Sequence, residues 1–312
     1  MLFRSGAKNS GSTVKMPDIR KVKTATYSNK TKMKFNNAVF MDHLRRHHSQ
    51  DESDKIPECT VIIKGKAKWK HNNQDMTFSE RQTFFKLANE SNTKSGNKRK
   101  NPFLKLFSKC ELMYGHNDDV YNGVANGSTA LLEKVVLHEG RKPHKIRYNG
   151  YYVFAVNAED VKYMQLQWTK DSAFSGSFTV APKTLTCRST MNVRIDNKEE
   201  KNDIVVTILQ FGVLNNHATT GHKLQGKSVD SLLVGEYNTT LPNWIYVVLS
   251  RVRKLKDLYL LKKLPKDKSL TPHQQMTDMM ERLRKRILWK QDIGKIQEMR
   301  QRIPVYQPEI IE

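Results

Sequence analysis

The spacing of apolar residues predicts strands alternating with helices in the first third of the chain. Lys21–Tyr27 and Thr60–Trp69 alternate in the manner of strands, and apolar residues at helical spacing predict a helix over Lys32–His48. Thr77-Phe78-Ser79-Glu80 fits a capping box, in which a threonine and a glutamate three residues later bond each other's backbone amides. We therefore expect a second helix to begin there.

Between residues 109 and 202 apolar residues recur at every second position, a period typical of antiparallel strands. Asn122-Gly123 and Asn126-Gly127 are hairpin-turn dipeptides within this segment. The continuous apolar run in Asp203–Leu214 then predicts a strand buried in a parallel sheet. This order favours an α/β domain that is interrupted by a small antiparallel β-barrel.

The last hundred residues return to longer apolar runs. Asn243–Arg253 predicts a helix, and the six apolar residues of Trp244–Leu249 indicate that it is buried around its whole circumference. A strand is expected over Asp257–Leu264 and a basic helix over Thr271–Arg302.

Charge narrows the choice of partner. The formal net charge is +23 and the pI is near 9.8, which favours a polyanion, and nucleic acid first. The three cysteines form no Cys-x-x-Cys pair, so we expect neither a disulfide framework nor a metal site. No apolar run is long enough to span a membrane and the N-terminus is not a signal peptide, so we expect an intracellular, nuclear protein without membrane contact.

The segment His217–Ser228, HATTGHKLQGKS, has two interpretations. Gly221–Ser228 fits Gly-x-x-x-x-Gly-Lys-Ser, the phosphate loop of a nucleotide triphosphatase or kinase, with Lys227 on the phosphates. Such a loop must open into a helix, whereas the apolar run after Ser228 predicts a strand followed by a loop. Hydroxyls, an imidazole and an ammonium between glycines also suit a nucleic-acid backbone, or simply a polar turn.

Arg251 follows the apolar helix and needs an anionic partner if it is buried. That anion is either a carboxylate of the chain, such as Asp257 or Glu236, or a phosphate across a cleft. The residues alone leave both open.

Taken in order, HATTGHKLQG, WIYVVLSRV and DLYLL resemble the last motifs of superfamily 1 helicases of the PIF and RecD branch, a form that Helitron-type helicases share. Two weaker pieces agree with this resemblance. Asn29 and Asn36 are spaced as in the fourth motif, and Asn117 to Ser128 matches the hairpin of the barrel insertion.

The resemblance implies a RecA-like second motor domain at residues 21–108 and 203–265, with the fold of a phosphate-loop NTPase. It also implies a β-barrel at 109–202, an irregular start at 1–20 and a basic helical tail at 266–312. The phosphate-loop and magnesium motifs of a first motor domain do not occur in residues 1–312. By the same resemblance, the function is that of the C-terminal half of an ATP-dependent 5'–3' DNA helicase, which alone hydrolyses ATP negligibly.

The resemblance also assigns residues. Arg251 becomes the arginine finger on the γ-phosphate, and Gln225 and Gly226 lie near the nucleotide. Thr220, His222 and Lys223, with Asn29, contact single-stranded DNA. ATP and Mg²⁺ are held mainly by the first motor domain, which is the implied partner besides DNA. The alternative is a non-catalytic basic nucleic-acid-binding protein, a remnant of a mobile element.

Overall fold

The computed structural model describes residues 18–47, 60–70, 73–82, 84, 102–170, 172, 174–195, 198–238, 241, 244–262, 274, 277–278 and 281, with the backbone alone between 187 and 204. The irregular start expected at 1–20 lies outside these residues up to position 17, and the expected tail helix lies almost entirely outside them. The chain divides into two compact units, 1–237 with 248–262, and 238–247 with 263–312. The helices and strands described below belong to the first unit, except for the helix at 244–249, of which residues 244–247 belong to the second.

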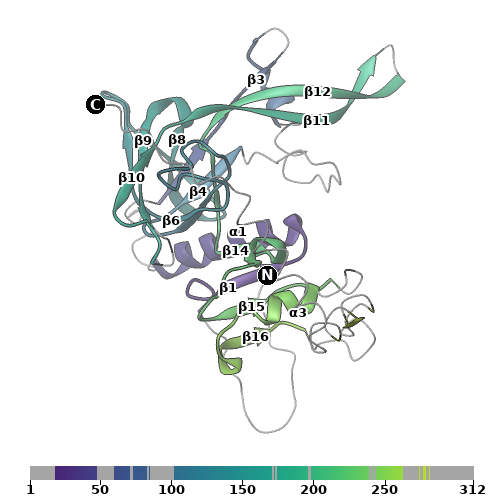
Figure 1. The fold of residues 1–312 in the computed structure, drawn as a ribbon. Coiled ribbons are helices and arrows are strands. Elements are labelled where there is room, and N and C mark those ends of the chain that lie inside the picture. Colours follow the sequence, from purple (N-terminus) through teal and green to yellow (C-terminus); the bar gives the residue numbers. More distant parts are fainter. Residues whose placement is uncertain are drawn as a thin grey trace, which may run out of the picture. The chain divides into compact units, whose positions relative to one another are not determined.

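A four-stranded parallel sheet runs in the order β14-β1-β15-β16. Its strands are β1 (Lys23–Thr26), β14 (Ala218–Thr220), β15 (Leu232–Val234) and β16 (Leu258–Leu260). The helix α1 (Asn29–His47) packs against β1 and β14 (Figure 1). It begins three residues before the expected position because Ser28 caps it: the Thr31 amide donates to Ser28 Oγ at 3.1 Å.

Asn36 fastens α1 to the sheet. Its side-chain amide donates to the carbonyls of Asn215 and Ala218 at 3.0 and 3.1 Å, and its oxygen accepts the Ala218 amide at 2.8 Å. These three bonds fix the start of β14, and therefore the loop that follows this strand.

Most of the remaining described residues form sheets of mainly antiparallel strands, in the orders β10-β9-β6-β5-β13 and β4-β2-β8-β7, and among these described pairs only β2 and β8 are parallel. The strands are β2 (Val61–Lys64), β4 (Phe103–Leu106), β5 (Glu111–Tyr114), β6 (Thr129–Leu137), β7 (His144–Tyr148), β8 (Tyr151–Asn157), β9 (Val161–Trp168), β10 (Ser177–Val180) and β13 (Val213–Asn215). Ile63, Leu132 and Val153 from both sheets share one buried core with Phe40 and Leu44 of α1. Mixed α/β structure is thus confirmed. The β-barrel expected at residues 109–202 stays a prediction, since the described strand pairs give only the order of strands within each sheet.

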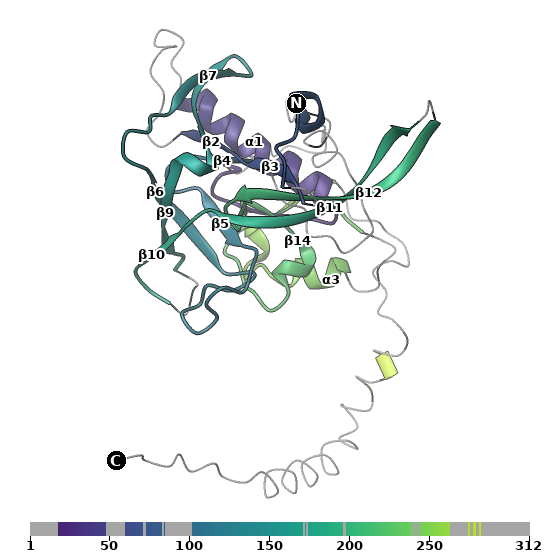
Figure 2. The same cartoon turned by 90° about the horizontal axis from the view of Figure 1, so that it is seen from above.

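The prediction of a buried parallel strand over Asp203–Leu214 is wrong. β12 (Lys198–Gln210) pairs antiparallel with β11 (Lys183–Ile195), in a hairpin whose two strands have thirteen residues each, and with β3 (Lys66–Trp69) at its base (Figure 2). Val206 and Ile208 are buried while their neighbours are half-buried, so the run has one core face. A short apolar run does not tell a strand that is buried on both faces from a strand that is buried on one face.

Thr60–Trp69 also differs from its prediction. It forms two strands, β2 and β3, which separate at Gly65 and join different sheets. A Cβ at Gly65 would lie 2.8 Å from the Ile208 side chain, so only glycine fits this crossing. Both strands pair outside the parallel sheet, although the segment was expected in the motor domain.

Three further expectations have mixed outcomes. The capping box is confirmed, since Glu80 Oε2 accepts the Thr77 amide at 2.8 Å and the Glu80 amide donates to Thr77 Oγ1 at 3.3 Å. The helix expected over Asn243–Arg253 is only α3 (Trp244–Leu249), and Tyr246 within it is 67% exposed, so burial around the whole circumference is wrong. The final strand is likewise shorter than Asp257–Leu264.

Asn36→Ala should lower the free energy of unfolding by about 2–3 kcal/mol, because three hydrogen bonds are lost and backbone groups of β14 are left without a partner. Asn29→Ala, at the exposed first residue of the same helix, is the matched control and should change stability by less than about 0.5 kcal/mol. Urea unfolding of both variants measures the difference. Equal stability of the two would contradict the role given to Asn36.

Candidate nucleic-acid interface

The loop that follows β14 carries the residues predicted to contact nucleic acid. It begins with a 3-10 turn, η2 (Gly221–Leu224), in which Leu224 is buried while His222 and Lys223 are exposed. The strand predicted after Ser228 is confirmed as β15. A phosphate loop needs a following helix whose N-terminal amides bind the phosphates, and residues 225–238 contain no helix. The Gly-x-x-x-x-Gly-Lys-Ser sequence is therefore not a phosphate loop.

Four of the predicted site residues gather at one edge of the parallel sheet. Thr220 is the last residue of β14 and pairs in register with Thr26, the last residue of β1. Asn29 follows β1, and His222 and Lys223 follow β14. Because both strands are parallel, all four residues lie at their carboxyl ends, the edge where open α/β sheets bind ligands.

Arg251 lies apart from this group. Its carbonyl accepts the Val229 amide at 2.9 Å, and Val229 precedes β15, so Arg251 sits beside the amino-terminal end of that strand. Gln225 and Gly226 are exposed and lie in the connection between β14 and β15, and Gly226 has a positive φ of 77°. The structure therefore brings Arg251 near the end of the Gln225–Gly226 connection but not to the carboxyl edge.

The sequence suggested an ion pair between Arg251 and either Asp257 or Glu236. The contacts observed at Arg251 and at Glu236 are different ones. Arg251 Nη2 donates to Ser250 Oγ at 2.8 Å. Arg253 instead pairs with Asp230 at 3.5 Å, and Glu236 accepts the Ser28 amide at 2.8 Å. Glu236 thus closes the junction between β1 and α1 rather than neutralising an arginine.

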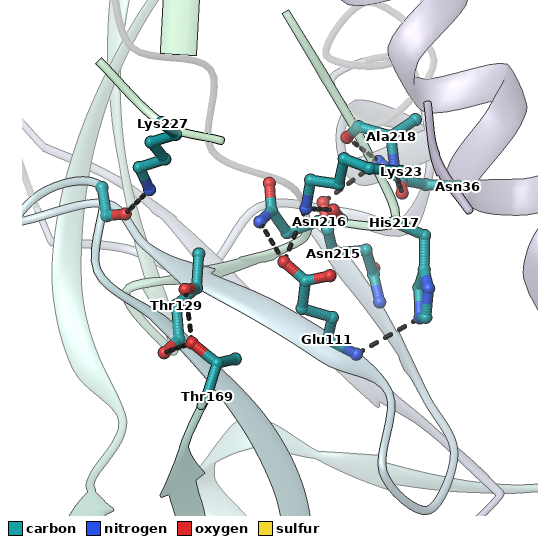
Figure 3. A network of polar contacts seen from close by, with 11 residues as sticks. Lys23, Asn36, Glu111, Thr129, Thr169, Asn215, Asn216, His217, Ala218 and Lys227 are labelled. Carbon is teal, nitrogen blue, oxygen red and sulfur yellow. Dashed lines mark hydrogen bonds and ion pairs between the residues drawn. The ribbon is translucent and has the colours of Figure 1, made fainter. Parts of the chain in front are cut away.

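Two lysines tie the loop after β14 to the hairpin connection between β5 and β6. Lys223 Nζ donates to Asn126 Oδ1 at 3.1 Å. Lys227 Nζ donates to the Gly127 carbonyl at 3.1 Å (Figure 3). The sequence suggested Asn126-Gly127 only as a turn. In the structure this turn is also bonded to the loop that carries the predicted DNA-contacting residues.

A largely buried polar network joins β1, β5 and the crossover between β13 and β14. Lys23 Nζ donates to Glu111 Oε1 at 2.5 Å and to the Asn216 carbonyl, and Asn216 Nδ2 donates to the same carboxylate oxygen at 2.7 Å (Figure 3). Burial lowers the pKa of Lys23, while the Glu111 carboxylate acts in the opposite direction. Lys23 comes from the parallel sheet and Glu111 from β5, so the network joins the two parts of the fold.

His217 completes the network as a neutral ring. The Glu111 amide donates to His217 Nε2 at 3.2 Å, so this nitrogen must be unprotonated. Burial lowers the pKa of His217 to about 4, and its ring stacks on Phe107 with centroids 5.5 Å apart. The imidazole is therefore a structural acceptor near neutral pH.

The sequence did not single out Lys23, Glu111 or the acceptor role of His217. Lys23 and Glu111 are 88 residues apart, and no local pattern connects them. Among the described residues, no group of three or more His, Cys, Asp or Glu side chains could hold a metal ion. Within the same residues, no helix has both the length and the apolar character needed to cross a bilayer.

Comparison with known proteins gives structural neighbours only. No family model and no curated protein matches the chain. The Bacteroides Pif1 helicase solved with ADP-AlF3 and single-stranded DNA is similar at 16% identity and a TM-score of 0.46, over 89% of this chain and 48% of that one. Pif1 helicase from Candida albicans is similar at 14% identity and a TM-score of 0.46, over 87% and 52%. The chain spans about half the length of these neighbours.

The neutral state of His217 predicts a pH dependence. Its pKa of about 4 in the folded protein lies below the ordinary 6.5, so folding favours the neutral ring. The stability that the ring contributes is fully present above pH 6.5 and is lost as the pH falls towards 4. Against His217→Phe, which keeps the ring stack, the wild type should lose on the order of 3 kcal/mol over this window.

Urea unfolding of both proteins at several pH values between 7 and 4 measures this difference. All other titrating groups are shared, so they cancel. A difference in stability that stays constant with pH would contradict the assignment.

Proposed function

We propose that this chain is the second motor half of a DNA helicase of the PIF and RecD branch. It binds single-stranded DNA at the carboxyl edge of the parallel sheet and contributes Arg251 to a nucleotide held by a first motor domain. That domain belongs to another part of the same protein or to another chain. Residues 1–312 alone hydrolyse ATP negligibly in this proposal.

The observation that carries the proposal is the gathering of Asn29, Thr220, His222 and Lys223 at one edge. These residues come from two motifs about 190 residues apart in the sequence, and the register of β1 with β14 brings them to neighbouring strand ends. Polar and basic groups at exposed strand ends suit a phosphate backbone without base readout. The net charge of +23 supports a polyanionic partner.

Arg251 supports the nucleotide half of the proposal through its fixed backbone. Its amide donates to the Val248 carbonyl at 3.1 Å and its carbonyl accepts Val229, so the base of the side chain is held on both sides. A guanidinium positioned in this way can stabilise the charge that develops on a transferred phosphoryl group. The phosphates and Mg²⁺ themselves require groups of the other domain, since catalysis here is mostly positioning and charge stabilisation.

Lys223→Gln should weaken binding of a single-stranded oligodeoxynucleotide about three- to tenfold and make the slope of log K against log salt shallower by about 0.7. The loss of one phosphate contact causes both changes. Lys162→Gln, an exposed lysine on β9, is the matched control and should change neither. Fluorescence anisotropy between 50 and 300 mM salt, about the range in which counterion release is measured, gives both quantities. Equal effects of the two variants would contradict a localised interface.

Arg251→Ala should lower single-stranded-DNA-stimulated ATPase about a thousandfold or more when a first motor domain of the same branch is fused to this chain. Arg253→Ala is the control, because Arg253 pairs with Asp230 at the surface and should leave turnover within about twofold. The fusion partner without this chain sets the baseline.

Three results would contradict this assignment. If the fusion shows no more ATPase activity than the first motor domain alone, the alternative of a non-catalytic nucleic-acid-binding protein is favoured. An ATPase that survives Arg251→Ala removes the arginine finger. Rapid turnover by residues 1–312 alone, abolished by Lys227→Ala, restores the phosphate-loop interpretation.

A further inference from the structure

The connection between β5 and β6, residues 115–128, is held rigidly by its own side chains. Asn117 Oδ1 accepts the Asn126 amide at 2.9 Å, and Asp119 Oδ2 accepts Asn122 Nδ2 at 2.6 Å. Ser128 Oγ donates to the Gly123 carbonyl at 2.6 Å. We call this connection the tip loop.

Aromatic residues support the tip loop from below. Gly123 has a φ of 81°, and a Cβ there would lie 2.3 Å from the ring of Phe174. Phe174 packs against Trp168 with ring centroids 5.6 Å apart, and Trp168 stacks on Phe178 at 4.1 Å. Glycine at this position lets the loop rest directly on the aromatic ring.

The apex of the tip loop exposes two apolar side chains. Tyr121 is 97% exposed and Val120 is 60% exposed. A flexible loop could expose an aromatic ring at little cost, but this loop is fixed by four side chains and a packed ring. Neither residue contributes to the core, so folding does not explain an aromatic side chain at this position.

Two lysines of the loop after β14 bring positive charge into contact with the tip loop. Lys223 and Lys227 donate to Asn126 and Gly127, whose oxygens are neutral, and among the described residues neither ammonium has a carboxylate partner. The nearby Asp118 carboxylate is engaged by Lys183 and by the Tyr114 hydroxyl. An exposed ring on a loop that also binds unneutralised ammoniums is the combination that holds single-stranded nucleic acid.

We infer that Tyr121 is a stacking platform for one base of a single-stranded nucleic acid whose backbone follows Lys223 and Lys227. This inference rests on the proposed function, because it names a further contact of the same strand. A docked protein would need a larger apolar patch than the side chains of Val120 and Tyr121 provide. A single ring instead matches the area of one base.

The test compares a thymidine oligonucleotide with an oligomer of the same length in which the bases are absent. Tyr121→Ala should weaken binding of the thymidine oligomer by roughly five- to a hundredfold, and should leave binding of the abasic oligomer unchanged. Tyr121→Phe keeps the ring and should bind both like the wild type. Phe78→Ala removes another aromatic ring, 72% exposed on a different element, and should change neither affinity.

The outcomes separate this inference from the proposed function. If the wild type binds the thymidine oligomer and Tyr121→Ala binds it equally well, the stacking role is wrong while the function stands. Equal loss for both oligomers also overturns stacking, because it shows a general effect on the loop. Absence of salt-dependent binding by the wild type itself contradicts the proposed function.

Discussion

The ammonium of Lys23 is the point on which the arrangement of the two sheets depends. It lies between the Glu111 carboxylate and the Asn216 carbonyl, at the boundary of the parallel sheet and β5. A buried ammonium without a partner costs several kcal/mol, so β1 is stable in this position only while Glu111 is there. Glu111 also binds the Asn216 side chain, and its own amide is bonded to His217. The short crossover from β13 to β14 is therefore fixed at both of its residues, Asn216 and His217.

This fixed crossover determines where the exposed loops lie. β13 belongs to the antiparallel part and β14 to the parallel sheet, so the position of the crossover sets the direction in which β14 leaves it. The loop after β14 then meets the Asn126-Gly127 turn, and two lysines bridge the gap. The basic loop after β14 and the tip loop with its exposed aromatic residue come from separate sheets and thus form one surface. The nucleic-acid interface that we propose follows from the buried network and not from the loop sequence alone.

Local signals in the sequence predicted local structure well. The Thr77–Glu80 capping box, the strand predicted within Lys21–Tyr27 (observed at Lys23–Thr26) and the strand after Ser228 are confirmed, because each depends on neighbouring residues. Pairing between distant segments was predicted poorly: the run after Asp203 looked like a buried parallel strand, and Gly65 gave no visible sign that Thr60–Trp69 divides between two sheets. The motif residues at the carboxyl edge were named from the sequence, and their contact with DNA stays a prediction, whereas the sequence did not point to Lys23 and Glu111. Their partnership exists only after β1 and β5 have met.

The most direct measurement is photo-crosslinking of a single-stranded oligodeoxynucleotide that carries a photoreactive base, with the modified peptides identified by mass spectrometry. Adducts are expected in residues 219–224 and in the tip loop around Tyr121, and competition by unlabelled single strands should remove them. Adducts confined to other surfaces, such as β7 or the β11–β12 hairpin, would show that the strand runs elsewhere and would contradict the interface built on the Lys23 network.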